Sequence, residues 1–141
     1  MTSALSIRLE HNGKTYSGEV MRIKSTMLGY EDHGILTVFL HCEGAGSGVG
    51  VGGMALDAYD EDRKERVGSA YGLDHITALM RVVGVSQWEH LAGKDVVVLF
   101  DAAGDTHWGH ASVGIASLDG NRVLILAEHA AEWREREGAT P

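Results

Sequence analysis

The chain has 141 residues, of which 44% are hydrophobic, and this length fits one domain, residues 1–141, built around a single core. Acidic residues outnumber basic ones by 20 to 12, and the formal net charge of −8 argues against nonspecific binding of a nucleic-acid polymer, which needs Lys and Arg to neutralise phosphates. One cysteine, Cys42, no long apolar stretch and no signal-peptide pattern at the start predict a soluble, cytoplasmic protein without an internal disulfide or a membrane span.

The first part of the chain predicts antiparallel strands. Residues 6–10 alternate apolar and polar side chains, and Asn12-Gly13 after them is a strong signal for a tight hairpin. We expect the second arm of this hairpin over residues 15–27. A further strand is expected over residues 35–43, with its even-numbered residues on one face and its odd-numbered residues on the other.

A glycine-rich segment follows these strands. Residues 44–53 predict a turn and another strand, in which Val49 and Val51 point one way while the intervening glycines leave the other face bare. The next segment, residues 57–66, carries mixed charge, and we expect it to be a solvated loop.

A change of period then predicts the main helix. Apolar residues recur at helical spacing between Ser69, a suitable N-cap, and Gly84, a suitable stop. The apolar positions of this helix are Leu73, Ile76, Leu79, Met80 and Val83. Residues 86–89 read as a capping box that opens a helix of one turn, which Gly93 ends.

The last part of the chain predicts strands and a closing helix. Residues 96–100 form an unbroken apolar strand, and residues 111–118 and 122–126 are expected to pair as a hairpin. The closing helix carries an apolar stripe that includes Trp133, after which we expect it to fray. The order of elements predicts an α+β fold, a mostly antiparallel β-sheet with one main helix, a short helix and a C-terminal helix.

The glycines of the segment GVGVGG leave two interpretations open. Gly48, Gly50 and Gly53 fit the pattern G-x-G-x-x-G, but no helix follows and the Walker lysine is missing, so a classical nucleotide-binding fold is rejected. Packing of the bare face against a ring or a backbone is the favoured interpretation. The alternative is a nest of backbone N–H groups that accepts a phosphate.

The ionisable cluster Glu31-Asp32-His33 also has two interpretations. With Gly34 it fits a turn in which glycine takes a positive φ, and we favour this slightly. A catalytic site would use Glu31 and His33, which share a face of a strand, whereas Asp32 would point away. A metal site would need a further histidine ligand, for which the candidates are His41, His75, His107 and His110; no metal-binding spacing supports one.

Nucleophilic catalysis has little support in the sequence. Cys42 lies inside a predicted strand and is expected in the core, and no serine stands in G-x-S-x-G. We therefore expect no catalytic residues, no metal and no cofactor, and a protein that is not an enzyme.

Three segments carry a resemblance to a known family. The stretch LGYEDHGILT, the glycine-rich stretch ending in Gly-Gly and the later WEHLAGK resemble a group of small phage-encoded proteins over about residues 23–100. The chain is identified as a member of the Thoeris anti-defence sponges, which bind and sequester cyclic ADP-ribose signals and, in some members, other cyclic nucleotides. The resemblance implies a non-enzymatic homo-oligomer, a dimer or an assembly of dimers, in the cytoplasm of an infected bacterial host.

For such a ligand the candidate contacts come from several segments. Glycines would offer backbone N–H groups, arginines would bind phosphates, tyrosines would stack on a base and carboxylates would bind ribose hydroxyls. The candidates in that order are Gly48, Gly50 and Gly52; Arg22 and Arg81; Tyr71 or Tyr30; and Glu31 and Asp32. A bulky residue at Gly50 is then expected to remove binding and leave the fold.

Two other classes of function remain open. A phage enzyme that degrades a nucleotide signal would use Glu31 and His33 as acid and base. A protein-binding inhibitor of a host factor would use the acidic segment 57–66 as its interaction surface.

Overall fold

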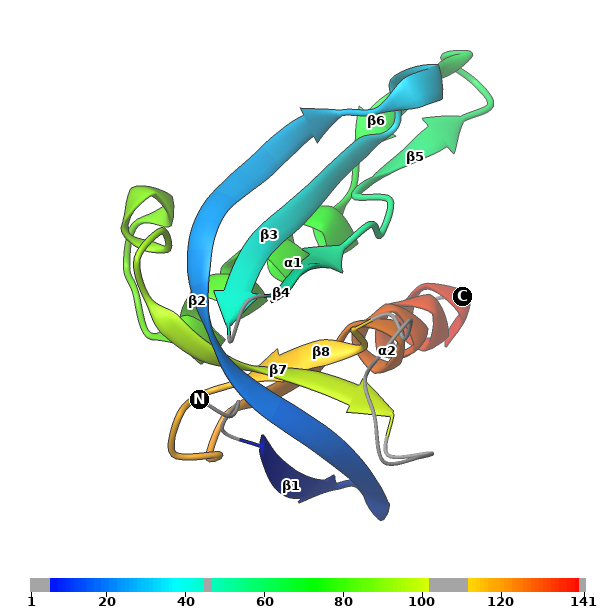
Figure 1. The fold of residues 1–141 in the computed structure, drawn as a ribbon. Helices are drawn as coiled ribbons and strands as arrows, with labels where there is room; N and C mark the ends of the chain where they lie inside the picture. The colour runs from blue at the N-terminus through cyan, green and yellow to red at the C-terminus, as the bar shows by residue number, and fades with distance from the viewer. Residues whose placement is uncertain (1–5, 45–46, 102–111, 140–141) are drawn as a thin grey trace.

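A curved antiparallel sheet, traversed by one long strand, is the framework of the computed structural model, which describes residues 6–44, 47–101 and 112–139 (Figure 1). This confirms the expected α+β architecture. The seven strands of the sheet are β1 (Ser6–His11), β2 (Lys14–Tyr30), β3 (Leu36–Gly44), β4 (Ser47–Gly52), β7 (Asp95–Asp101), β8 (Gly114–Ala116) and β9 (Val123–Ile125). Their order is β4-β3-β2-β7-β8-β9, and β1 also pairs with β2.

Strand β2 is longer than the residues 15–27 that the sequence predicted, and it holds the two halves of the sheet together. Its first part pairs with β1 and β7 on opposite sides, and its last part pairs with β3. The register to β3 shifts between Ile23 and Ser25, where a bulge bends the strand. The predicted hairpin before it is confirmed, because Asn12 and Gly13 take φ values of 51° and 77° between β1 and β2.

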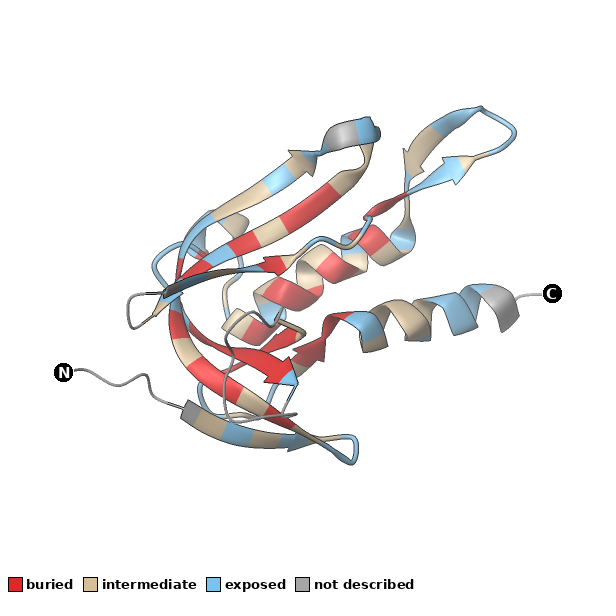
Figure 2. Ribbon diagram, turned by 45° about the vertical axis from the view of Figure 1, so that its right-hand side comes forward, coloured by how far each residue is buried: buried red, intermediate tan, exposed pale blue. Residues whose placement is uncertain are grey.

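The sheet is buried on both faces along β7. Val96, Val98 and Phe100 face the main core, whereas Val97 and Leu99 face a smaller core on the opposite side of the sheet. A strand buried on both faces reads as a continuous apolar run, which is why residues 96–100 were recognised from the sequence. Figure 2 shows this buried strand beside the helix that covers the main core.

That helix, α1 (Ala70–Val83), begins and ends where the sequence predicted. The Ser69 hydroxyl accepts a hydrogen bond from the Gly72 N–H, and Gly84 ends the helix with a φ of 90°. Leu79 is buried in the main core. Leu73 was predicted in the same apolar stripe, but this prediction is wrong, because its side chain is 67% exposed on the first turn.

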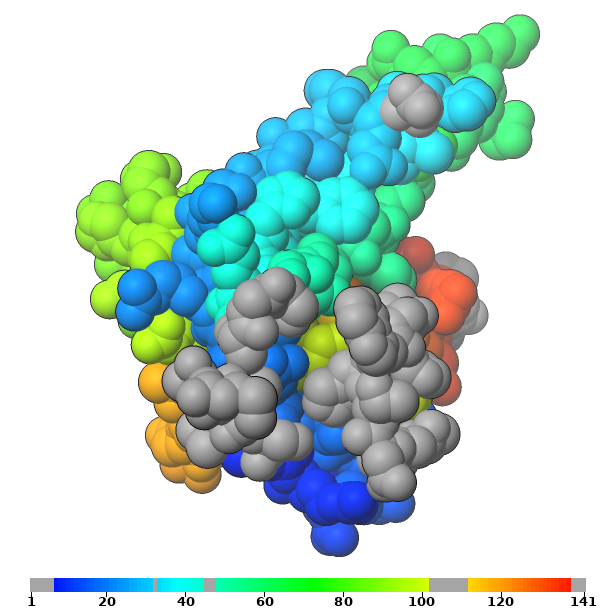
Figure 3. Space-filling model, viewed as in Figure 1, coloured from blue at the N-terminus to red at the C-terminus, as the bar shows by residue number. Residues whose placement is uncertain are grey.

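The segment 57–66 was predicted to be a solvated loop, and the structure corrects this. It forms most of a hairpin of β5 (Asp57–Asp60) and β6 (Glu65–Gly68). Asp57 is buried; its carboxylate accepts hydrogen bonds from the Leu36 backbone N–H at 3.2 Å and from the Arg66 guanidinium at 2.8 Å. The ion pair joins the two strands of the hairpin, and the bond from the Leu36 N–H attaches the hairpin to β3, at the arm visible in Figure 3.

The remaining elements complete the second half of the molecule. A 3-10 turn, η2 (Trp88–His90), replaces the expected capping box, because its N-cap is Gln87 and no side chain caps it. The hairpin of β8 and β9 is confirmed. The closing helix, α2 (Leu126–Ala139), continues beyond Trp133, where the sequence predicted fraying. It contacts α1 and β9 at the edge of the main body.

Candidate functional site

A surface cleft of about 620 Å³ lies between both helices, the β1–β2 turn and the β8–β9 turn. Its walls include apolar side chains of α1 and β9, such as Val82 and Leu124, and a rim of charged and amide side chains. Small-molecule sites commonly combine an apolar lining with a few polar groups in a volume of roughly 300–1,000 Å³. The cleft therefore has the size and character of such a site.

Two arginines, Arg81 and Arg122, line the cleft. Arg81 stands in the last turn of the helix, and the Arg122 guanidinium lies against Gly84, where an added Cβ would be 3.3 Å from Nη2. The sequence analysis included Arg81 among the candidates, but it did not single out Arg122. The β8–β9 turn brings Arg122 to α1, and this approach has no signature in sequence spacing.

Glu128 connects α2 to the β1–β2 turn. Its Oε1 lies at hydrogen-bond distance, 3.0 Å, from His11 Nε2 and accepts a hydrogen bond from Asn12 Nδ2 at 2.8 Å. Glu10 and Glu132 also line this cleft. The lining of the cleft therefore carries three carboxylates as well as the two arginines.

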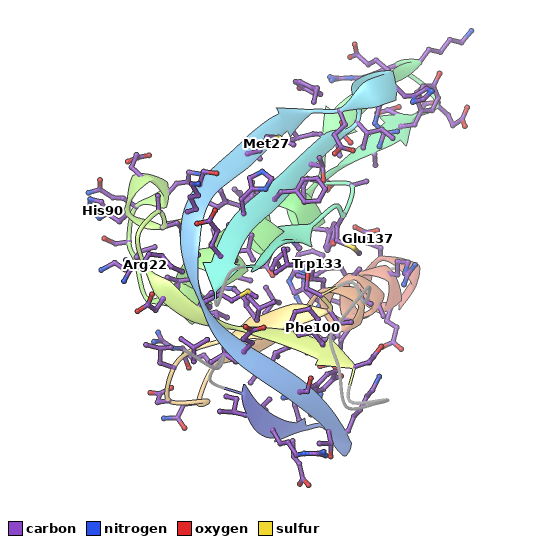
Figure 4. All side chains as sticks on the ribbon, viewed as in Figure 1. Arg22, Met27, His90, Phe100, Trp133 and Glu137 are labelled. Carbon is purple, nitrogen blue, oxygen red and sulfur yellow. The ribbon has the colours of Figure 1, made fainter. Side chains whose placement is uncertain are left out.

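Behind the cleft, the carboxylate of Asp74 connects the two helices. Asp74 Oδ2 lies 2.7 Å from His129 Nε2 and accepts a hydrogen bond from Trp133 Nε1 at 3.2 Å. Asp74 Oδ1 lies 3.6 Å from Arg81 Nη2. The hydrogen bond with His129 is the main cause that lowers the pKa of Asp74, so this carboxylate stays ionised into acid. In Figure 4, Trp133 lies where α2 faces α1.

Three aromatic rings pack against one another at tilted angles beside this carboxylate. The ring centroids of Tyr71, His75 and His129 lie 5.4 to 5.8 Å apart. Within the described ranges, buried side-chain atoms without a hydrogen-bond partner are confined to these rings: Tyr71 Oη, both ring nitrogens of His75 and His129 Nδ1. Burial, and then the charge of His129, lower the pKa of His75 to about 4, so that His75 is neutral at pH 7. Tyr71, a predicted stacking residue, thus belongs to this cluster, and its half-buried ring contacts His129 rather than projecting into solvent.

The predicted glycine face carries another hollow, of about 310 Å³. It is lined by Gly48 and Gly50 together with His41 and Lys24, whose ammonium pairs with Glu43 at 3.1 Å. On the same face the rings of Phe39 and His41 stack with centroids 6.2 Å apart. The bare face is thus exposed at Gly48 and Gly50, as the sequence predicted.

Packing explains the glycines closer to the end of β4. An added Cβ at Gly52 would stand 1.9 Å from the Val38 carbonyl oxygen, so only glycine fits there. At Gly53 an added Cβ would touch the Phe39 ring at 3.4 Å, whereas at Gly50 it would meet that ring at an ordinary 3.5 Å. Gly52 is therefore a packing glycine, and Gly50 has room for a side chain.

The other predicted contacts lie outside both hollows. Arg22 pairs with Asp95 at 3.3 Å on β2, and Figure 4 shows it on the other side of the view from Trp133. Tyr30, 73% exposed, and Glu31 stand at the tip of the β2–β3 arm. Asp32 begins the short turn η1 (Asp32–Gly34), and its side chain is outside the described part of the structure. The nine candidates are therefore not one site.

The Glu31-Asp32-His33 cluster forms the turn that the sequence favoured. Residues His33 and Gly34 both have a φ of 72°, which confirms the positive φ expected of Gly34. Across the portions of the chain with defined positions, no three His, Cys, Asp or Glu side chains are placed to hold a metal ion. His107 and His110 lie outside the described residues. Cys42 is buried as predicted, and burial raises the pKa of its thiol to about 12.

The chain matches no protein-family model, no curated protein and no solved structure. No helix in residues 6–44, 47–101 and 112–139 is long and apolar enough to cross a membrane.

Proposed function

We propose that this chain is a phage anti-defence protein that binds a cyclic ADP-ribose isomer or another cyclic nucleotide signal in the cleft and retains it unchanged. The observation that carries the proposal is a cleft of about 620 Å³ whose lining includes both Arg81 and Arg122. Guanidinium groups are well suited to phosphates, and the apolar floor offers a surface for a base. The resemblance to the Thoeris sponges supports the same class of ligand.

The walls of the cleft complement different parts of a nucleotide. The arginines of the cleft attract the phosphates, and the carboxylates of Glu10 and Glu132 can accept hydrogen bonds from ribose hydroxyls. A net charge of −8 does not prevent this, because two guanidinium groups suffice locally for two phosphates. From the resemblance, the proposal includes a homo-oligomer in the cytoplasm of an infected bacterium.

The contact between Asp74 and His129 favours a second candidate, an enzyme that hydrolyses the ligand. A carboxylate that orients a histidine is a common arrangement for a general base. However, His129 Nε2 is occupied by Asp74, and Nδ1 is buried without access to the cleft. The imidazole therefore presents no free nitrogen to a ligand, and retention is the better supported function.

The test is a ligand screen with recovery of the bound compound. The purified protein is screened by thermal shift against cyclic ADP-ribose isomers, cyclic di- and trinucleotides and linear controls, and each ligand that stabilises it is released by heat and analysed by chromatography. We expect a large shift and an intact ligand. A chemically changed ligand would establish the enzyme, and the absence of any shift would reject both in favour of a protein-binding inhibitor.

Two variants then locate the site. Arg122→Gln removes a guanidinium from the cleft, and Gly50→Val adds a side chain to the glycine face, where the structure leaves room for it. We expect Arg122→Gln to lose affinity and Gly50→Val to keep it. Loss of binding in Gly50→Val alone would instead place the ligand on the glycine face, as the sequence analysis expected.

A further inference from the structure

The second half of β2 is a free edge of the sheet. The last residue bonded on the side of β7 is Ile23, whose N–H donates to the Lys94 carbonyl at 2.8 Å and whose carbonyl accepts from the Gly93 N–H at 2.7 Å. Within the described residues, the strand pairs of residues 25–30 are with β3 alone. Figure 1 shows this part of β2 with β3 on one side only. The other side is therefore open to a further strand.

The register to β3 decides which backbone groups face this free edge. Hydrogen-bonded and non-bonded residue pairs alternate along an antiparallel ladder. The Glu31 N–H donates to the Ile35 carbonyl at 2.9 Å, so the odd-numbered residues of this part of β2 bond to β3. Thr26, Leu28 and Tyr30 therefore direct their backbone N–H and C=O groups away from β3, to the outside.

The segment lacks the features that protect an edge strand from pairing. Such strands usually carry charged side chains or proline, or are very short. Residues 25–30 read STMLGY, without a charge or a proline, and Leu28 and Tyr30 are 45% and 73% exposed. By contrast, the edge strand β1 carries Arg8 and Glu10, and the edge strand β9 has three residues. The end of β2 is thus the edge that favours association.

A second copy of the same segment fits this edge. When two copies pair antiparallel with Leu28 facing Leu28 across a two-fold axis, Thr26 of each copy faces Tyr30 of the other. Every outward N–H and C=O group of these three residues then has a partner. A shift of two residues in either direction leaves some of these groups unpaired, so the backbone selects one register.

The side chains agree with this register. Thr26, Leu28 and Tyr30 lie on one face of the strand, where Leu28 meets its own copy and Tyr30 meets Thr26, an aromatic side chain beside a β-branched one. On the other face Met27 lies opposite Gly29, which has no side chain to obstruct it. Both faces therefore pair apolar or small groups without a clash of like charges.

Charges at the two ends of the segment favour the antiparallel direction. Lys24, whose side chain is 66% exposed, precedes the segment, and the exposed Glu31 follows it. Antiparallel pairing brings Lys24 of each copy beside Glu31 of the other, whereas parallel pairing would bring like charges together. Lys24 also pairs with Glu43 of its own β3 at 3.1 Å, but an exposed pair of this kind contributes little and does not prevent the second contact.

We propose that residues 25–30 of β2 are a dimerisation edge, which pairs antiparallel with the same segment of a second copy and places Leu28 on the two-fold axis. The proposed function includes a homo-oligomer without a defined surface, and this inference supplies one. It rests on the free edge and not on the ligand, because no residue of the segment lines the cleft.

Single cysteines test the register. Leu28→Cys places two thiols on residues that face each other, with Cα atoms about 5.5 Å apart, which a disulfide can span. Tyr30→Cys is the matched control, because Tyr30 is more exposed than Leu28 but faces Thr26 in this register. The native Cys42 is buried. Under a mild oxidant we expect Leu28→Cys to form a covalent dimer at least about tenfold faster than Tyr30→Cys.

Edge variants test the assembly itself by sedimentation of the full chain. Leu28→Pro removes an N–H that points outward and leaves the bonds to β3 in place, so it should raise the dissociation constant of the dimer at least about tenfold. Leu28→Lys places like charges on the axis and should do the same if Leu28→Pro does not fold. Tyr59→Ser, at a 51% exposed position of β5, is the control and should assemble like the wild type.

Specific outcomes overturn the inference. They are a wild-type monomer at every attainable concentration, equal cross-linking of Leu28→Cys and Tyr30→Cys, faster cross-linking of Met27→Cys than of Leu28→Cys, or unchanged assembly of the folded edge variants. The proposed function fails separately. A wild type that dimerises through this edge but binds no cyclic nucleotide would reject the proposed function and support the dimerisation edge.

Discussion

The burial of His75 links the stability of the protein to pH. The side chain is fully buried, and its pKa falls from 6.5 to about 4, first because of burial and then because of His129. At pH values between about 4 and 6.5, His75 is protonated in the unfolded chain and neutral in the folded chain. Stability is therefore greatest above pH 6.5 and falls as the pH is lowered towards 4, by about 3 kcal/mol in all.

Replacement of His75 by phenylalanine tests this link. The new side chain keeps an aromatic ring beside Tyr71 but cannot be protonated, so His75→Phe should lose about 3 kcal/mol less than the wild type between pH 7 and pH 4. At pH 7 it should be at least as stable, because two buried nitrogens without partners are removed. The measurement is urea unfolding across this range, with the exposed His41→Gln as control. Parallel pH profiles for wild type and His75→Phe would contradict the assignment.

Some individual residues of the candidate site could be predicted from the sequence. Arg81 was named from its residue type, and it does line the cleft. The connection of Asp74 to His129 was missed, because the two residues are 55 positions apart and no spacing rule joins them. Trp133 was read only as apolar, although its indole N–H also bonds to Asp74. Asp74 stands past the first turn of α1, where it gives no capping signal.

At the scale of elements, helix α1 illustrates how periodicity predicts a helix but overestimates its buried face. Ser69 and Gly84 cap the ends as their residue types require. The apolar stripe, however, includes Leu73, which is 67% exposed although its neighbour Gly72 is buried against the Leu56 backbone, whereas Leu79 is 1% exposed in the core. The spacing of residues cannot tell how far the buried face extends around the helix.

The two leucines make a matched pair of substitutions. Leu79→Ala leaves a cavity in the main core and should lower the free energy of unfolding by about 2–5 kcal/mol. Leu73→Ala, on the same helix with 67% exposure, should change it by less than about 0.5 kcal/mol. Chemical denaturation of both variants measures the difference. Equal losses would mean that Leu73 is covered in solution by another chain.

For the hairpin of β5 and β6, the sequence analysis predicted too little regular structure, because it expected a loop. Its segment is highly charged, so composition favoured a loop, yet strands form because Asp60 Oδ1 accepts from the backbone N–H groups of Asp62 and Arg63 and stabilises the turn. The pair of Asp57 and Arg66 then joins the two strands, and the Leu36 N–H donates to the Asp57 carboxylate and so connects the hairpin to the main sheet. Two of the charged residues in this segment thus form an ion pair between strands. A single sequence does not distinguish such a pair from the charged residues of a solvated loop.

At the scale of the whole molecule, exposed apolar side chains argue for association and net charge argues against it. Tyr30, Leu28 and Tyr59 are 73%, 45% and 51% exposed on the elements of the arm in Figure 3. A charge of −8 on each copy opposes contact between copies, and salt screens this repulsion. The homo-oligomer of the proposal should therefore become more stable as salt rises.

Light scattering across protein and salt concentration tests this expectation. We expect a mass that is a multiple of 15.1 kDa, more complete assembly in about 0.5 M than in about 0.05 M salt, and a melting temperature that rises with protein concentration. Tyr30→Ser should weaken an assembly that uses the arm, with His41→Gln as the control. A mass of one chain at every condition, with the ligand still bound, would leave the cleft of a single copy sufficient for capture, because Arg81, Arg122 and the cleft carboxylates all belong to one chain.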